Sequence, residues 1–221
     1  MYITIRPAVF SDLETLGEIQ FAALLPTTPV ERLIYPSGMT ANALTVSIKE
    51  KERRFKDTNV KYVNAVTESG RIISFARWYI WHQGRSHEDW GAAFTFHPSH
   101  HLTPEDMNVQ TARAFYQGID QLKKKNIAGK PCLYLSLIAT RPEYQGSGAG
   151  SQLLSWGINH AVEHRLNIYT VSTAASLSWY EKFGFRSVDE FCIDMTAMGG
   201  KDENGTLGVY TAKLMQFTVD K

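Results

Sequence analysis

The sequence has very few cysteines and no long apolar run. Only Cys132 and Cys192 occur among 221 residues. Strand-like residues flank both, so we expect two reduced thiols in the core rather than a disulfide framework. No apolar stretch approaches the roughly 20 residues that a membrane helix needs, and the amino terminus lacks a basic segment followed by an apolar one. These absences predict a cytoplasmic protein without a membrane partner.

The sequence also lacks an excess of either charge. Lys and Arg number 23 against 22 Asp and Glu, which gives a net charge of +1. Proteins that bind nucleic acids usually carry a strongly basic surface, so we expect no nucleic-acid partner. With 43% hydrophobic residues and no repeats, the chain is long enough to bury a core of its own. We therefore expect a single domain over residues 1–221, with a long irregular insert at about 83–105.

Hydrophobic periodicity predicts an alternation of strands and helices. Ser11 and Glu14 form a capping box at the start of the first helix. Strands are expected at 3–6, 60–67, 71–81, 132–140, 167–173, 185–195 and 207–217, and helices at 11–26, 40–55, 105–125, 150–162 and 175–184. The strands at 60–67 and 71–81 are close enough to form an antiparallel hairpin. The pattern predicts an α/β protein with a mixed sheet of about seven strands and four to five flanking helices.

A glycine-rich turn lies between the strongest strand and the helix that follows it. Residues 145–150 read Gln-Gly-Ser-Gly-Ala-Gly, and such a turn can aim successive N–H groups at an anion. A Walker loop would need a lysine after the last glycine, and no lysine lies between Arg141 and Arg165. A dinucleotide fingerprint would need glycine at Ser151. Both nucleotide motifs are therefore excluded, and a phosphate or pyrophosphate site remains.

Two segments resemble the GCN5-related N-acetyltransferase (GNAT) superfamily. The pattern formed by Gln145, Gly148 and Gly150 after the strand is similar to the family signature, which is Arg or Gln, two residues, Gly, one residue, then Gly or Ala. The segment 177–185, which contains Tyr180, resembles the family's tyrosine-containing helix and the strand start that follows it. The resemblance is close over 133–185 and looser over 3–24. It implies a single N-acetyltransferase domain with the GNAT fold, in which the sheet is mixed and mostly antiparallel.

The resemblance also implies a binding site for acetyl-coenzyme A (acetyl-CoA). It assigns the pantetheine and thioester end to Ile138, Ala139 and Thr140, and the pyrophosphate to Gln145, Gly146, Ser147, Gly148, Ala149 and Gly150. Many members carry asparagine where this chain has Thr173. A hydroxyl can make only part of the amide's hydrogen bonds, and we expect Thr173 and Ser176 to contact the coenzyme.

The implied reaction moves an acetyl group from acetyl-CoA to a primary amine by direct attack in a ternary complex, with a small-molecule acceptor and no metal. Tyr180 is the expected acid, because a phenol with a pKa near 10 stays protonated at neutral pH and can protonate the departing thiolate. No residue is singled out as the base. The alternative reading is an acyl-CoA-binding sensor or scaffold without catalytic activity.

The acceptor walls must come from outside these motifs. Trp78 and Trp81 can stack on a cationic or aromatic acceptor; the alternative is that both pack a sheet surface. Tyr134 and Ser136 alternate along the strand at 132–140 and can line the acceptor groove or order a water; the alternative is that they pack in the core or face a helix.

Histidines raise a separate hypothesis of a metal site. His97, His100 and His101 lie close together in the sequence, with His82 and His87 upstream. Pro98 interrupts any helical spacing, and neither a cysteine nor an adjacent glutamate completes a ligand set. We therefore predict no metal.

Overall fold

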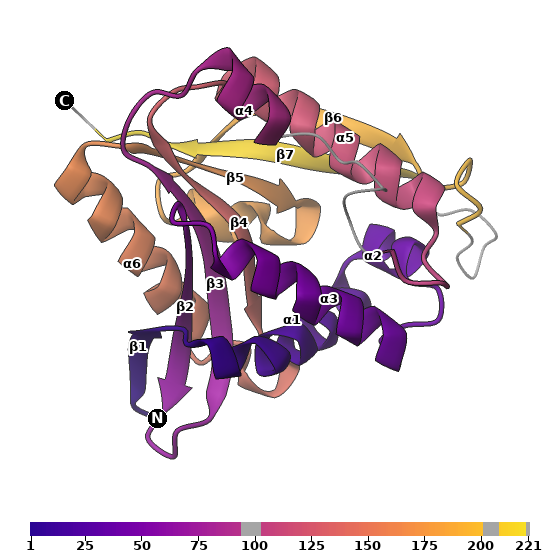
Figure 1. The fold of residues 1–221 in the computed structure, drawn as a ribbon, viewed down its shortest axis with the longest axis horizontal. Helices are drawn as coiled ribbons and strands as arrows, with labels where there is room; N and C mark the ends of the chain where they lie inside the picture. The colour runs from indigo at the N-terminus through magenta and orange to yellow at the C-terminus, as the bar shows by residue number, and fades with distance from the viewer. Residues whose placement is uncertain (94–102, 201–207, 220–221) are drawn as a thin grey trace.

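The computed structural model describes residues 1–93, 103–200 and 208–219. Its centre is a sheet of seven strands (Figure 1). The strands are β1 (Ile3–Pro7), β2 (Val60–Thr67), β3 (Ile72–Trp81), β4 (Cys132–Thr140), β5 (Asn167–Thr173), β6 (Arg186–Asp194) and β7 (Val209–Phe217). Their order is β1-β2-β3-β4-β5-β7-β6. Only β4 and β5 run parallel, and the other neighbouring pairs are antiparallel. The predicted mixed, mostly antiparallel sheet is confirmed.

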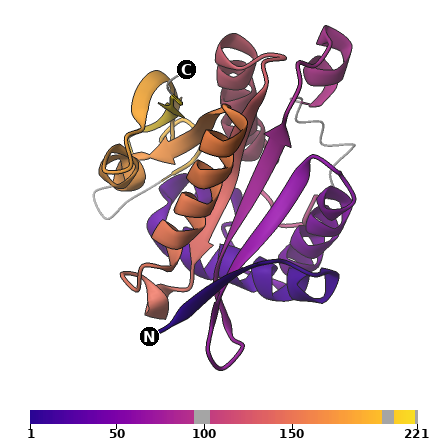
Figure 2. The same cartoon turned by 90° about the vertical axis from the view of Figure 1, so that its left-hand side faces the viewer.

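Helices cover both faces of this sheet (Figures 1 and 2). On one face lie α6 (Ala149–His164) and α7 (Leu177–Glu181). On the other lie α1 (Leu13–Thr27), α2 (Pro29–Ile34), α3 (Ala41–Phe55) and α5 (Val109–Asn126). The seventh described α-helix is α4 (His87–Ala93). The sequence predicts four to five helices because α2 and α4 are short and lie in segments that were expected to be irregular.

Three sequence expectations need correction. Ser11 does not cap α1, because a 3₁₀ turn at Phe10–Asp12 precedes the helix; the Asp12 carboxylate accepts the Val9 N–H at 2.9 Å instead. Cys192 is exposed rather than in the core, because it points away from the face of β6 on which Ile193 is buried, whereas Cys132 is buried. Part of the insert is helical, since α4 lies within 83–105. Among the described residues, no helix has the length and apolar character that a membrane crossing requires.

The two central parallel strands separate partway along their length. β4 and β5 are paired from Cys132 with Asn167 to Leu135 with Thr170, although both strands continue beyond this last pair. On its other edge, β4 stays paired with β3 as far as Thr140. We call the opening beyond Leu135 and Thr170 the fork.

A bulge lies at the same point of β4. Trp78 of β3 pairs with Leu135 and Arg77 pairs with Leu137, so Ser136 has no partner residue on β3. The Ser136 hydroxyl accepts a hydrogen bond from Arg77 Nε at 2.7 Å and donates one to the Arg77 carbonyl at 3.0 Å. Ser136 faces the side of the sheet that carries α3 and α5, as does Tyr134 two residues earlier, and the bulge puts Leu137 on that side as well.

Candidate functional site

The fork leaves one backbone edge of β4 without a neighbouring strand. Over Ser136–Thr140 the edge toward β5 has no strand partner among the described residues. An extended molecule can pair with such an edge through its own polar groups, as peptides do when they extend a sheet. Ile138 and Thr140 are partly buried on this segment, whereas Ala139 is buried in the hydrophobic cluster that the sheet forms with α1. Ala139 can therefore contribute only its backbone to a ligand in the fork.

The glycine turn follows the fork directly. Gly146 and Gly148 adopt φ values of +79° and +86°, a conformation that glycine reaches without steric cost. Gly148 directly precedes α6, a helix of 16 residues. The N–H groups at the start of this helix have no helical partner and point toward the glycine turn. Gln145 Nε2 lies 3.5 Å from the Thr140 carbonyl. The turn and the end of β4 thus form one continuous surface that suits an anion attached to an extended arm.

Small hydroxyl side chains gather where β5 ends. Thr173 Oγ1 lies 3.1 Å from Ser176 Oγ, which lies 3.0 Å from Ser172 Oγ. The structure brings Thr173 and Ser176 together, on the β5 side of the fork. Their hydroxyls are hydrogen-bonded to each other, so a ligand that binds one of them would have to replace this hydrogen bond.

Tyr180 lies at the base of the fork. Its side chain is 4% exposed and packs in the core beside Trp179 and Phe185. Its phenol lies beside the side chain of Thr170, the last β5 residue paired with β4. Burial raises the pKa of Tyr180 to about 12, and the Thr170 side chain opposes this shift. The phenol is therefore protonated throughout the neutral range.

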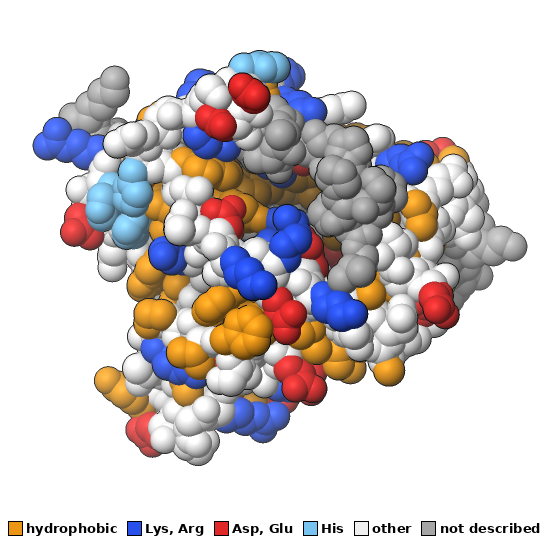
Figure 3. All heavy atoms as spheres, in the orientation of Figure 1, with side chains coloured by type: hydrophobic (Ala, Val, Ile, Leu, Met, Phe, Trp, Pro, Cys, Tyr) orange, Lys and Arg blue, Asp and Glu red, His pale blue; other side chains and the backbone are white. Residues whose placement is uncertain are grey.

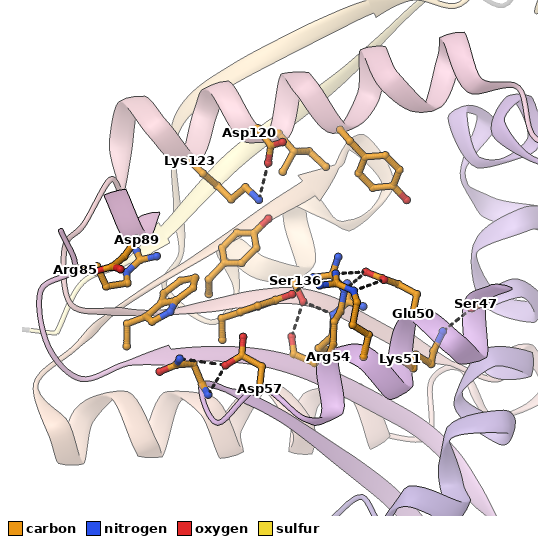
Figure 4. A pocket seen from close by; sticks show the side chains of 18 of the residues that line it. Ser47, Glu50, Lys51, Arg54, Asp57, Arg85, Asp89, Asp120, Lys123 and Ser136 are labelled. Atoms are coloured by element: carbon orange, nitrogen blue, oxygen red, sulfur yellow. Dashed lines mark hydrogen bonds and ion pairs between the residues drawn. The ribbon is translucent and has the colours of Figure 1, made fainter. Parts of the chain in front are cut away.

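A cavity of about 940 Å³ lies on the opposite face of the sheet, between α3, α5 and the segment after β3 (Figure 4). Its mouth is visible in Figure 3 as a hollow bordered by Lys and Arg side chains. Ser136, Tyr134 and Trp81 line it. Trp78 does not, because neighbouring residues on a strand point to opposite faces. It is fully buried under α6, where its ring fills the space at Gly157.

Several charged side chains point into the cavity from two helices (Figure 4). From α5, Asp120 pairs with Lys123 at 2.9 Å. From α3, Glu50 pairs with Arg54 at 2.5 Å. Within the described parts of the chain, no carboxylate lies within 4.0 Å of Lys51 or Arg77, which also face the cavity.

Lys51 is unusual because it is buried. Its side chain is 2% exposed, and its ammonium donates hydrogen bonds to Gln20 Oε1 and Ser47 Oγ, both at 2.7 Å. Burial is the largest cause that lowers the pKa of Lys51 to about 7, and the positive charges of Arg77 and Arg54 add to it. Glu31 shows the opposite response, since burial raises its pKa to about 7 while Lys51 lowers it.

Sequence reasoning missed Lys51, Glu50 and Arg77. The first two, with Ser47 and Arg54, recur at spacings of three and four on α3 and so share one face. Charged residues on one face of a helix normally indicate a solvent-exposed surface. The sequence therefore gives no sign that this face of α3 lines a cavity. His97, His100 and His101 lie outside the described residues, and His87 packs in α4 against Trp90 at a ring distance of 4.8 Å.

Comparisons with known proteins agree with this geometry. Residues 105–187 match the model of the acetyltransferase (GNAT) domain family. No curated protein matches the sequence. Among solved structures, arylalkylamine N-acetyltransferase 2 from Aedes aegypti aligns with a TM-score of 0.69 and 14% identity, covering 100% of both chains. A histone acetyltransferase HPA2-related acetyltransferase from Corynebacterium glutamicum aligns with a TM-score of 0.60 and 18% identity, covering 100% of this chain and 98% of that chain.

A third structure contains the coenzyme. It is a GNAT phosphinothricin acetyltransferase from Sinorhizobium meliloti in complex with AcCoA, with a TM-score of 0.54 and 17% identity; 99% of this chain and 89% of that one are covered. The resemblance inferred from the sequence is thus confirmed: residues 105–187 match the GNAT acetyltransferase domain, and the chain has the fold of the GNAT superfamily.

Proposed function

We propose that this chain is an acetyl-CoA-dependent N-acetyltransferase that moves the acetyl group directly to the primary amine of a small molecule. The observation that carries the proposal is the place of Ser136. It is the first β4 residue beyond the last β4–β5 pair, and it also lines the cavity. A thioester held in the fork would therefore face an acceptor held in the cavity.

Each part of the coenzyme has a matching surface. The pyrophosphate binds the N–H groups of the turn formed by Gln145, Gly146, Ser147, Gly148, Ala149 and Gly150. The pantetheine arm pairs with the free edge of β4 at Ile138, Ala139 and Thr140, and Thr173 and Ser176 contact it from the β5 side.

The reaction then needs one bond formed and one broken. The neutral amine attacks the thioester carbonyl to form the C–N bond, and the oxygen that gains charge accepts hydrogen bonds from β4 N–H groups at the fork. The C–S bond breaks, and Tyr180 donates its proton to the departing thiolate. The proton that the amine loses passes to water in the cavity.

The charge of the cavity favours an acceptor that also carries an acidic group. Arg77 lies beside Ser136 at the fork. Burial lowers the pKa of both Arg54 and Lys51, and the positive charge of Arg77 lowers both further. An acceptor carboxylate placed among these cations would relieve their mutual repulsion and form charge-assisted hydrogen bonds. Trp81 and Tyr79, whose rings stack at 5.4 Å, supply an aromatic wall for the rest of the acceptor.

Thiol release from acetyl-CoA tests this function with a matched pair of amines. Phenylalanine and phenethylamine differ only in a carboxylate, and we expect kcat/KM to be at least about tenfold higher for phenylalanine, the size of one charged hydrogen bond. In Arg77→Gln that ratio should fall toward one. Equal rates for the two amines would contradict the acidic acceptor. Binding of acetyl-CoA without thiol release for any amine in a broad panel would instead support the sensor.

A further inference from the structure

Three histidines from distant parts of the chain meet at the edge of the molecule. His82 directly follows β3, whereas His160 and His164 lie four residues apart on one face of α6. One ligand atom from each of the three lies within 4.8 Å of the other two. The ring centroids of His160 and His164 are 4.1 Å apart, and those of His82 and His164 are 4.8 Å apart. The patch appears in pale blue at the left of Figure 3, over the end of α6.

Hydrogen bonding fixes the tautomer of His164. Its Nδ1 lies 2.9 Å from the His160 carbonyl. A carbonyl oxygen can only accept, so Nδ1 carries the hydrogen and Nε2 keeps its lone pair. Histidine ligands of metal ions are commonly oriented by this kind of bond from the other ring nitrogen to a carbonyl.

His160 has a polar atom that nothing satisfies. Its Nε2 is buried and has no hydrogen-bond partner in the described chain. A buried polar atom without a partner is costly, and native structures usually supply one. The ring is held in place, because Trp156 stacks on one side with an interplanar angle of 9° and His164 on the other.

We propose that His82, His160 and His164 form a binding site for a divalent transition-metal ion such as Zn²⁺, which joins the end of β3 to the last turn of α6. Imidazole nitrogens suit this class of ion, and three of them leave a fourth position for water. With Zn–N bonds of 2.0–2.1 Å, nitrogens in a tetrahedral site lie about 3.4 Å apart, so small side-chain rotations bring the three within range. His82 also lines the cavity, so the ion would fix part of the cavity rim.

Zinc binding to the untagged full chain tests the site independently of acetyl transfer. After treatment with a chelator, calorimetry with ZnCl₂ should show one ion per chain, and zinc at 100 times its dissociation constant should raise the melting temperature by about 5 °C. His160→Gln and His164→Gln should each weaken binding at least about tenfold. His87→Gln is the matched control and should bind zinc like the native chain.

A second control separates this site from the histidines near residue 100. A variant with His97, His100 and His101 all changed to Gln should keep the zinc stoichiometry and the thermal shift. Each variant should melt like the native chain when metal is absent, which shows that it folds. The proposal is overturned if the native chain binds no stoichiometric zinc, if the double variant His160→Gln/His164→Gln binds normally, or if the triple variant loses binding.

Discussion

The Tyr180 phenol lies beside the side chain of Thr170, at the residue pair where β4 and β5 part. Thr170 also donates a hydrogen bond of 3.0 Å to the Leu135 carbonyl. This contact joins the candidate acid to both strands of the fork. The position of the phenol therefore depends on the sheet itself and not on the short helix α7 alone.

Removing this hydroxyl should affect turnover far more than coenzyme binding. In Tyr180→Phe we expect kcat to fall by about 10- to 100-fold, as expected for a single general acid, with the affinity for acetyl-CoA nearly unchanged. Tyr169→Phe is the control. Tyr169 of β5 is buried like Tyr180, but it packs in the hydrophobic cluster on the α5 side of the sheet. Steady-state kinetics and a coenzyme titration measure both quantities. A Tyr180→Phe enzyme with native kcat would remove Tyr180 from the mechanism.

Two glycines with similar positive φ values allow a controlled test of the glycine turn. Gly148 has φ +86° in the turn before α6, and Gly70 has φ +83° in the hairpin between β2 and β3. Alanine at either position should cost about 1–2 kcal/mol of stability. Only Gly148→Ala should also raise the dissociation constant of acetyl-CoA, by about tenfold, because it distorts the turn that we propose binds the pyrophosphate. Equal coenzyme affinity in the two variants would argue against this turn as the pyrophosphate site.

The two tryptophans of β3 should behave differently when changed to phenylalanine. Trp78 is 0% exposed and packs against Gly157, so Trp78→Phe should mainly lower the free energy of unfolding, by about 1–3 kcal/mol. Trp81 lines the cavity, with the Arg85 guanidinium 3.7 Å above its ring. Trp81→Phe should raise the acceptor KM about fivefold while leaving the KM for acetyl-CoA unchanged. If the acceptor KM is insensitive to Trp81→Phe, Trp81 does not contact the acceptor.

Burial of Lys51 should make stability depend on pH. Its pKa is about 7 in the folded chain and 10.5 when unperturbed. Between these values the unfolded state binds more protons, so the contribution of Lys51 to stability rises with pH. Lys51→Met lacks this contribution. We measure the free energy of unfolding of both proteins with denaturant. The value for the variant minus the value for the native chain should be larger at pH 7 than at pH 9.5. A difference that does not change with pH would mean that Lys51 titrates normally.

The sequence predicts β4 and β5 with their observed bounds because each is a run of strand-forming residues between clear turn signals. Thr40 likewise predicts the start of α3, where its side chain accepts the Ala43 N–H at 3.1 Å. By contrast, the sequence predicts no element between 26 and 40, where α2 lies; Pro29 begins this helix, and proline is favoured in the first turn.

The site was predictable only where one short segment carries it. The turn at 145–150 is local, whereas the cavity depends on which strand face meets which helix. Period two places Trp78 and Trp81 on opposite faces, but only the sheet order shows which of those faces carries α3 and α5. His82 and His160 are joined by tertiary packing alone, so no local pattern links them. The i, i+4 spacing of His160 and His164 was the one signal that could have indicated that site.

Calorimetric titration of acetyl-CoA into the native chain, at two temperatures so that a zero enthalpy cannot hide binding, tests most directly whether the fork and the glycine turn hold the coenzyme. The account predicts one molecule bound per chain. No detectable binding at either temperature would contradict it.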